Sequence, residues 1–453
     1  MAESDGVMLA PVRGKARIDV LDMLRGLAIL GILFINVPYM AAPVAKFSYD
    51  PRLIGWTGFD QVCWALQYLV WSGSQRCVLQ FLFGAGMMVL AAKAMEPDGP
   101  VAVADLYYRR NLWLLAFGLL DVVLLLWPGD ILHIYALAAL FLFPFRKLGP
   151  KTLVAIGLVW SLMVAVGIPE YGVREYVART TLIEHVAAAD ARRAAGLPMT
   201  GAGQRALTDW RGQLEKIYHP EQTREAIADE QAAHAGGVVP YFVHQWRDWF
   251  GLVQGWLYWS VIEAFCTMLI GIALWKWGVI QGQRSKRFYL GLLIAGYGIG
   301  FTLRGIGLAE VLRFGPEPRT IWFTNEFARL AIGLGHVALI NFAVKTRIGQ
   351  VILEPFKATG RMAFSLYFFQ QFVGMYILFS PFGFNLWGRF GWASMTAISL
   401  LMIAFEVVLA NLWMRRFTNG PMEWLWRSLA YVRWMPLRRP AAPCEAGGVP
   451  AAV

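Results

Sequence analysis

Long apolar runs alternate with short polar segments along most of the chain. Each run approaches the 20 or so residues that an α-helix needs to cross a bilayer. The pattern therefore predicts an all-α, polytopic membrane helix bundle of about ten transmembrane helices. The predicted spans are Val20–Met40, Arg76–Ala92, Leu112–Trp127, Ile131–Phe145, Thr152–Ile168, Trp256–Ile280, Phe288–Ile306, Ile321–Val344, Met362–Ser380 and Ala393–Trp413.

The composition agrees with this class. Of the 453 residues, 57% are hydrophobic and only 16% are charged, which excludes an ordinary soluble domain. The formal net charge of +11 would suggest nucleic acid as the partner of a soluble protein. Here we interpret it as basic residues held on one face of a membrane, and we expect the lipid bilayer, not nucleic acid, as the partner.

Charge placement predicts the orientation. The run Gly55–Trp71 is short and contains Asp60 and Gln67, so we expect an interfacial helix on the outer face. All basic clusters between spans then fall on one side, which the positive-inside rule identifies as the cytoplasm. Both termini are cytoplasmic in this arrangement, and a bacterial cytoplasmic (inner) membrane is expected. The clusters include Arg13, Lys15, Arg17, Lys93, Arg109, Arg110, Arg146, Lys147, Arg284, Lys286, Lys345, Arg347, Arg415 and Arg416.

The pattern divides the chain into four parts. Residues 1–168 and 252–431 each hold five predicted spans. Residues 169–251 are rich in Ala and mixed charge, which predicts a long extracytoplasmic insertion of short polar helices. The insertion either covers a site or decorates the surface, and we favour decoration. Residues 432–453 are rich in Pro, Ala and Gly, which predicts a disordered cytoplasmic tail.

The first predicted span carries polar residues on one face. A charge inside a bilayer costs about 2.5–3.5 kcal/mol on insertion scales, so it needs a partner or a function. Asp22, Arg25 and Asn36 lie within about 60° of each other around the helix. Asp22 and Arg25 either form an ion pair that fixes the helix end or shape the mouth of a path. For Asn36 we favour a functional role.

A second polar face runs along the span Ile321–Val344. Glu326, Arg329 and His336 lie within about 80° of each other, and the first two are spaced to pair. A titratable face of this kind favours a lined cavity over lipid contact. An internal salt bridge with one hydrogen-bonded histidine would produce the same pattern.

The segment Trp127–Leu137 combines a tight turn with an acid and an imidazole. Pro128 and Gly129 form the turn, and Asp130 can cap the following helix. His133 is three residues further on, and a carboxylate beside an imidazole orients it and raises its basicity. A plain helix cap is the alternative interpretation of Asp130.

Single polar residues mark other spans. Arg76 and Arg304 lie near predicted outer ends, and Gln370 lies in the middle of a span. Such groups either contact a substrate or link helices. The chain has no P-loop, dinucleotide fingerprint or serine-hydrolase elbow. No His/Cys cluster has the spacing of a metal site, so no metal is expected.

Several blocks resemble known membrane proteins. The form R-x-x-x-L-D-x-L-R-G, from Arg17 to Gly26, with the polar Asn36 ten positions later, resembles the first helix of the transmembrane acyltransferase superfamily. Further blocks resemble the YeiB-like family of bacterial membrane proteins and its C-terminal domain of unknown function. These blocks are SQRCVLQFLFGAGM (Ser74–Met87), GDILHIYAL (Gly129–Leu137), GRMAFSLYFFQQ (Gly360–Gln371) and RFTNGPMEWLWRSLAY (Arg416–Tyr431).

The resemblance implies a fold shared with the lysosomal heparan-glucosaminide N-acetyltransferase. That enzyme passes acetyl from cytosolic acetyl-CoA to a glucosamine on the far side of the membrane. By this likeness Asn36 matches an active-site asparagine. The histidine that follows this asparagine in the enzyme is absent from VPYMAAPVAKFSYD. Either His133 or Asp130 serves as the base, or the chain does not run that chemistry.

The resulting hypothesis is acyl transfer from cytoplasmic acyl-CoA, as co-substrate, to a hydroxyl or amine of an extracytoplasmic small molecule or glycan. Arg25, with Asp22 beside it, and Arg361 would bind the donor phosphates. Asn36 would stabilise the oxyanion, and His133, held by Asp130, would take the proton. The candidate substrate-binding residues are Arg76, Glu326, Arg329, His336, Gln370 and Arg304.

Two other functions fit the same residues. Intramembrane Glu, Arg and His side chains also suit a proton-coupled transporter or exporter of a small molecule. A non-catalytic membrane scaffold would use the insertion and tolerate substitution of the polar faces. The sequence leaves a homodimer open.

Overall fold

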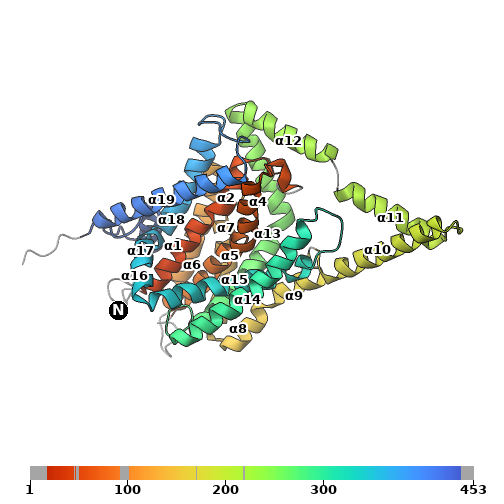
Figure 1. The fold of residues 1–453 in the computed structure, drawn as a ribbon. Helices are drawn as coiled ribbons and strands as arrows, with labels where there is room; N and C mark the ends of the chain where they lie inside the picture. The colour runs from red at the N-terminus through yellow and green to blue at the C-terminus, as the bar shows by residue number, and fades with distance from the viewer. Residues whose placement is uncertain are drawn as a thin grey trace, which may run out of the picture.

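The computed structural model describes residues 18–44, 46, 50–91, 102–169, 171–217 and 220–439. The basic residues Arg13, Lys15, Arg17 and Lys93 and residues 440–453 of the predicted tail lie outside these ranges. The described part is helical apart from loops and one antiparallel bridge between Phe417 and Arg438. The predicted class, a polytopic bundle of helices, is confirmed (Figure 1).

Six helical segments are long and apolar enough to cross a membrane. They identify the chain as a membrane protein and coincide with six of the predicted spans. They are α1 (Asp19–Gly31) with α2 (Leu33–Ala41), α4 (Gly58–Leu66) and η3 (Gln67–Trp71) with α5 (Ser74–Ala91), α13 (Val238–Lys276), α14 (Lys286–Val311), α15 (Ile321–Val344) and α19 (Trp392–Arg416).

The four other predicted spans are short or interrupted helices, so the count of ten remains a prediction. The turn at Pro128–Gly129 and the 3-10 turn beginning at Phe143 limit one of them to nine residues. The elements concerned are α6 (Ala102–Leu120) with the π-helix η5 (Asp121–Leu125), α7 (Leu132–Leu140) with η6 (Phe143–Lys147), α8 (Pro150–Gly157) with α9 (Val159–Val166), and α18 (Ala363–Phe372) with η7 (Val373–Leu378).

The bundle has two recognisable sides. We call the side where α1 begins the terminal side. The shorter helices α16 (Arg347–Leu353) and α17 (Pro355–Arg361) belong to it (Figure 1). The helix α20 (Pro421–Ala430) lies there as well, since it lines one cavity together with Arg25 and Arg361. We call the opposite side the insertion side. There α10 (Val173–Ala194) projects from the bundle, α11 (Gly201–Ile217) runs back beside it, and α12 (Pro220–Ala235) leads into α13 (Figure 1).

The predicted interfacial segment is helical and reaches the insertion side. It forms α4 and η3 and is preceded by the 3-10 turn η2 (Pro51–Leu53). The Asp60 carboxylate accepts the backbone N–H of Ala393 at 2.8 Å and so caps the start of α19. Only Ser72 and Gly73 separate η3 from α5.

The insertion continues directly into the bundle. α13 has 39 residues, about 58 Å of helix, and crosses the predicted boundary at residue 251 without a break. Residues 238–251 therefore belong to a helix that is continuous with a membrane span. The insertion is thus connected rigidly to the bundle at this end.

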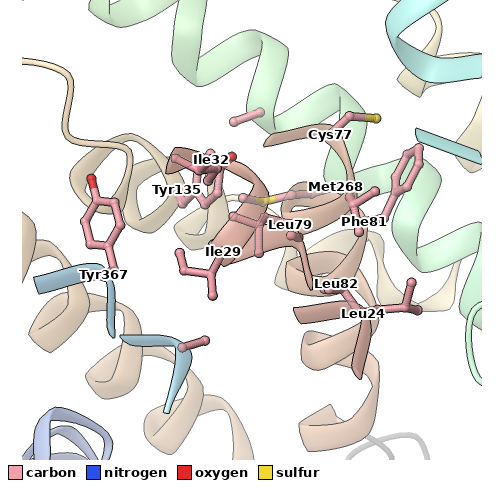
Figure 2. Close-up of a cluster of buried hydrophobic side chains, with 14 of the residues drawn as sticks. Leu24, Ile29, Ile32, Cys77, Leu79, Phe81, Leu82, Tyr135, Met268 and Tyr367 are labelled. Atoms are coloured by element: carbon pink, nitrogen blue, oxygen red, sulfur yellow. The ribbon is translucent and has the colours of Figure 1, made fainter. Parts of the chain in front are cut away.

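Apolar side chains from separate segments of the chain form the core. Leu24 and Ile29 of α1 pack with Leu79 and Leu82 of α5 and with Met268 of α13 (Figure 2). Burial of these side chains and their dispersion contacts fixes the positions of the helices. The polar residues described below are therefore held on rigid helical segments.

The glycine of the R-G pair allows α1 to pack directly on α17. A Cβ at Gly26 would contact the hydroxyl of Thr359, and a Cβ at Gly360 would contact the carbonyl oxygen of Asp22. The two backbones are too close for a side chain at either position. This contact fixes the terminal-side end of the first span against the C-terminal half of the chain.

We expect Gly360→Ala to lower the free energy of unfolding by about 1–3 kcal/mol, because the added methyl has no space. Gly291→Ala on α14 is the matched control, since nothing lies within 4 Å of a Cβ there. The control should be neutral or stabilising, because alanine is the better helix former. Unfolding by SDS in mixed micelles measures both, and equal stabilities would contradict the packing argument.

Candidate functional site

Most of the predicted site residues meet in one cavity of about 440 Å3 on the insertion side. It lies between α2, α5, α7, α13, α14 and α15. We call it the insertion-side cavity. Seven predicted residues line it: Asn36, Arg76, Asp130, His133, Arg304, Glu326 and Arg329.

His133 and Asp130 form a fixed pair at the start of α7. The Asp130 carboxylate accepts the backbone N–H groups of Leu132 at 3.0 Å and His133 at 2.9 Å, as the sequence predicts for a helix cap. It also accepts the Nδ1–H of His133 at 2.7 Å. Since Asp130 only accepts, Nδ1 carries the proton and Nε2 is left with a free lone pair. No described residue hydrogen-bonds Nε2, so it can act as a base toward a molecule in the cavity.

Two further side chains interact with the Asp130 carboxylate of this pair. The hydroxyl of Tyr367 donates to Asp130 at 2.9 Å. The carboxyl of Asp121, at the start of η5, is fully buried and interacts with Asp130. No donor among the described residues reaches either Asp121 oxygen. Asp121 belongs to no motif, and only its position in an apolar run marks it as unusual.

Asn36 presents an amide to the cavity. It lies on α2, one turn before Tyr39, and is 9% exposed. No described side chain or backbone group hydrogen-bonds its side chain, so its N–H groups remain available for a ligand. The predicted polar face of the first span is thus divided. Asp22 and Arg25 lie at the terminal-side end of the span, and Asn36 faces the insertion-side cavity.

A buried ion network forms another wall. Arg329 donates to Glu326 at 2.9 and 3.0 Å and lies 3.2 Å from Glu263. It also donates to Gln80 and Thr267 at 3.0 Å. Each of the three guanidinium nitrogens of Arg329 therefore has a partner, and the pairing with Glu326 is the one that the spacing predicted. Arg329 therefore stabilises the bundle beside the cavity.

The other two arginines of the cavity, Arg76 and Arg304, differ in how exposed their side chains are to a ligand. Arg76 pairs with Glu263 at 2.9 Å, yet 41% of its side chain stays accessible from the cavity. Arg304 is buried and donates to the carbonyl oxygens of Tyr68 at 2.6 Å and Ser72 at 2.7 Å. Arg304 thus caps the end of η3, and Arg76 is the cation that a ligand can reach.

Two predicted substrate-binding residues lie outside this cavity. Gln370 is fully buried and donates to Glu406 at 2.9 Å and to the carbonyl of Ile29 at 3.3 Å. This links three helices of the bundle. His336 contacts the Tyr297 hydroxyl at 2.8 Å and faces a separate apolar groove.

A second cavity, of about 230 Å3, opens on the terminal side. Arg25 and Arg361 line it, as the sequence hypothesis requires, and Arg110 and Arg427 line it as well. Asp22 lies behind this terminal-side cavity, 2.9 Å from Arg25 and 3.6 Å from Arg361. Four arginine side chains line this cavity against one carboxyl, that of Glu423, so its lining carries an excess of positive charge.

One layer of side chains separates the two cavities. Ile131 lines both of them. Tyr367 lines the terminal-side cavity, and its hydroxyl bonds Asp130 in the insertion-side cavity. The base candidate His133 therefore lies directly behind the wall that ends the terminal-side cavity.

Sequence reasoning missed two groups of residues. Arg110 and Arg427 look like ordinary topology signals, because arginine at the cytoplasmic end of a span is common. The aromatic wall of the insertion-side cavity has no sequence signature, because tryptophan is frequent near membrane surfaces. The aromatic wall consists of Tyr39, Trp71, Trp127, Trp249 and Trp256.

The insertion docks on the bundle near this cavity. The His234 ring of α12 stacks on Trp387 with ring centres 3.8 Å apart. The carboxylate of Glu230 accepts the backbone N–H of Val44 at 2.9 Å. Burial lowers the pKa of His234 to about 4. Docking therefore requires the neutral imidazole.

Acid is expected to release α12. The folded-state pKa of His234 lies below the ordinary value of 6.5, so its contribution is complete above pH 6.5 and is lost as pH falls toward 4. At pH 5 the docking of α12 loses about 2 kcal/mol of free energy, which raises the population with undocked α12 about 30-fold. Hydrogen exchange of residues 220–235, corrected for intrinsic rates, measures this. His234→Phe should remove the pH dependence, and an unchanged pH dependence in this variant would contradict the assignment.

Comparisons with known proteins agree with the resemblance to YeiB-like proteins. Residues 274–433 match a family described as a protein of unknown function (DUF418). The chain is 29% identical to the uncharacterized protein YxaH of Bacillus subtilis (strain 168), across 95% of this chain and 98% of the relative. It is 24% identical to the uncharacterized protein YeiB of Escherichia coli (strain K12), across 90% and 95%. An uncharacterized 39.9 kDa protein from the amylase 3' region of Bacillus acidopullulyticus is 22% identical across 94% and 97%.

No solved structure matches the chain. The matches with relatives cover both halves of the bundle as well as the DUF418 region. The chain is thus a membrane protein similar to YxaH and YeiB over most of its length, and its residues 274–433 match the DUF418 family.

Proposed function

We propose that this protein is a membrane-bound acyltransferase. It moves an acyl group from acyl-CoA on the terminal side, which we assign to the cytoplasm of a bacterial inner membrane, to a hydroxyl or amine on the insertion side. The observation that carries the proposal is the pair of cavities with the His133–Asp130 pair at their shared wall.

The terminal-side cavity suits the donor. Its four arginines offer charge-assisted, bidentate hydrogen bonds to phosphate groups. Beyond them the wall turns apolar, with Ile29, Leu82 and Leu132, which suits the uncharged arm of the donor. For the reaction, the proposal requires the thioester to pass the layer at Ile131 and Tyr367 and enter the insertion-side cavity, where it meets His133.

The insertion-side cavity suits the acceptor and the chemistry. Nε2 of His133 takes the proton from the acceptor hydroxyl or amine as its O or N bonds to the thioester carbon. The amide of Asn36 donates to the oxyanion that forms. The C–S bond then breaks, and the imidazolium returns the proton to the departing thiolate. Asp130 holds the ring and stabilises its positive charge throughout.

Binding of the donor tests the proposal. We expect saturable calorimetric binding of acetyl-CoA, and Arg25→Met should weaken it about 10- to 100-fold, because a hydrogen bond to a charged group is lost. Arg109→Met is the control, since Arg109 pairs with Asp105 on the surface at 3.1 Å and lies outside the cavity lining. If neither acetyl-CoA nor longer acyl-CoA binds, the acyltransferase proposal fails.

A proton-coupled transporter is the second candidate. The single layer at Ile131 between two cavities also suits a path that opens alternately to each side. The complete pairing of Arg329 argues against it, since a proton path needs groups that can change partners. Substrate movement across liposomes in the absence of any acyl-CoA would favour the transporter.

A further inference from the structure

The carboxyl of Asp121 is a buried titratable group that the proposed reaction does not use. Asp121 is 0% exposed and begins the π-helix η5, which continues α6. No donor among the described residues reaches either of its oxygens, and no cation among them interacts with its carboxyl. An ionised carboxylate at this position would lack both a hydrogen bond and a counter-ion, which is costly inside a protein.

Asp130 is the neighbour of this carboxyl. The two side chains lie within hydrogen-bonding range of each other. The backbone of α6 brings them together, because Gly118 packs closely on the start of α7. A Cβ at Gly118 would contact Oδ2 of Asp130 and the backbone nitrogen of His133. Asp121 is three residues after Gly118, so it follows on the same face of the helix. We call Asp121 and Asp130 the acid pair.

Of the acid pair, Asp130 is the member suited to carry the charge. Its carboxylate accepts hydrogen bonds from the Tyr367 hydroxyl, from two backbone N–H groups and from Nδ1 of His133. These four donors stabilise the ionised form of Asp130, whereas no donor reaches Asp121. Two adjacent buried carboxyls do not both ionise, so the shared proton is expected on Asp121.

The groups around the acid pair leave this balance in place. Among the described residues, the titratable side chains that face the acid pair are His133 on α7 and Tyr367 on α18. From α13 the indole of Trp249 approaches the His133 ring, with ring centres 6.1 Å apart, and carries no charge. Arg76 of α5 lines the same cavity but pairs with Glu263 at 2.9 Å.

We propose that Asp121 is a positioning residue that keeps its proton and donates a hydrogen bond through it to the Asp130 carboxylate. This bond spreads the negative charge of Asp130, so Asp130 holds a proton on His133 less strongly. The proton that His133 takes from the acceptor is then released readily to the departing thiolate, and the acid pair keeps its protonation state throughout. The role toward His133 rests on the proposed function, whereas the proton on Asp121 is independent of catalysis.

Two substitutions separate this role from a purely structural one. Asp121→Asn keeps a donor toward Asp130 and adds no charge, so the pH–rate profile of acyl transfer should match that of the wild type. Asp121→Leu removes the donor, and the acid limb of the profile should move to higher pH by about one unit. Rescue of the profile by asparagine but not by leucine is the expected result.

Two outcomes of these assays would overturn the proposal. An acid limb that stays in place in Asp121→Leu would show that the residue only supports the fold. An acid limb that moves to lower pH in Asp121→Asn would show that Asp121 is ionised in the wild type, because the substitution would then remove a negative charge near His133.

Infrared spectroscopy of the full-length protein at neutral pH tests the proton directly. The wild type should show the carbonyl stretching band of a protonated carboxylic acid, and Asp121→Asn should remove the part of it that belongs to Asp121. Glu406→Gln is the matched control, since Glu406 is buried elsewhere in the bundle, bonds Gln370 and lies outside the cavity lining. It should leave the Asp121 band in place. An identical band in the wild type and in Asp121→Asn would overturn the proposal.

The two measurements together separate this inference from the proposed function. A band that Asp121→Asn removes, in a protein that transfers no acyl group, supports the protonated Asp121 and overturns the acyltransferase. Acyl transfer by a protein whose band is unchanged in Asp121→Asn supports the acyltransferase and overturns the role of Asp121.

Discussion

Replacement of His133 by glutamine is expected to slow acyl transfer about 100- to 10 000-fold, the usual contribution of a general base. Glutamine keeps a polar group near Asp130 but has no titratable nitrogen to accept the acceptor's proton. Acetyl-CoA binding should not change, because His133 does not line the terminal-side cavity. Initial rates with saturating acetyl-CoA measure the effect.

His185→Gln provides the control for this variant, since His185 is exposed on α10 away from both cavities. Its rate should equal that of the wild type. If His133→Gln retains full activity, His133 is not the base, and the account of the insertion-side cavity would have to be abandoned.

Replacement of Arg329 by methionine is expected to destabilise the fold by about 3–5 kcal/mol. The substitution leaves Glu326 and Glu263 buried without their shared cation. The matched control, Arg109→Met, removes an exposed pair with Asp105 and should cost at most about 1 kcal/mol.

SDS-induced unfolding in mixed micelles compares the two variants on one scale. A cost for Arg329→Met no larger than that of Arg109→Met would show that the network is not structural. In that case Arg329 would become available as a substrate-binding residue, as the sequence hypothesis has it.

The helical pattern alone predicted most of the fold. Apolar runs of span length identify α13, α14, α15 and α19, because the bilayer requires continuous apolar helices. The predicted domain boundary at residue 251 falls inside α13, where the helix continues without a break. The first turns of α13 are polar enough to look like part of the insertion, yet helical hydrogen bonding continues through them.

Local spacing predicted the pairs within the site. Asp130 with His133, and Glu326 with Arg329, are each three residues apart, so helix geometry alone brings them together. Contacts between distant segments had no such signal. Tyr367 reaches Asp130 from α18, and Arg427 reaches the terminal-side cavity from α20 only through tertiary packing.

Some polar residues have partners that the sequence does not reveal. Gln370 bonds Glu406 inside the bundle, while His336 bonds Tyr297 beside the apolar groove. From sequence both look like residues of the cavity, because a buried polar side chain has the same pattern whether it contacts a helix or a ligand. Only the packing of neighbouring helices distinguishes these cases.

Transfer across a sealed membrane tests the central claim most directly. The protein is reconstituted in liposomes, with glucosamine in the lumen as the acceptor. Acetyl-CoA with a labelled acetyl group is added outside. Liposomes in which the terminal side of the protein faces outward are compared with liposomes in which it faces the lumen. The account predicts labelled product on the insertion side and free CoA on the terminal side, only where the terminal side faces the donor. No product with either orientation, or labelled acetyl-CoA appearing intact in the lumen, would contradict it.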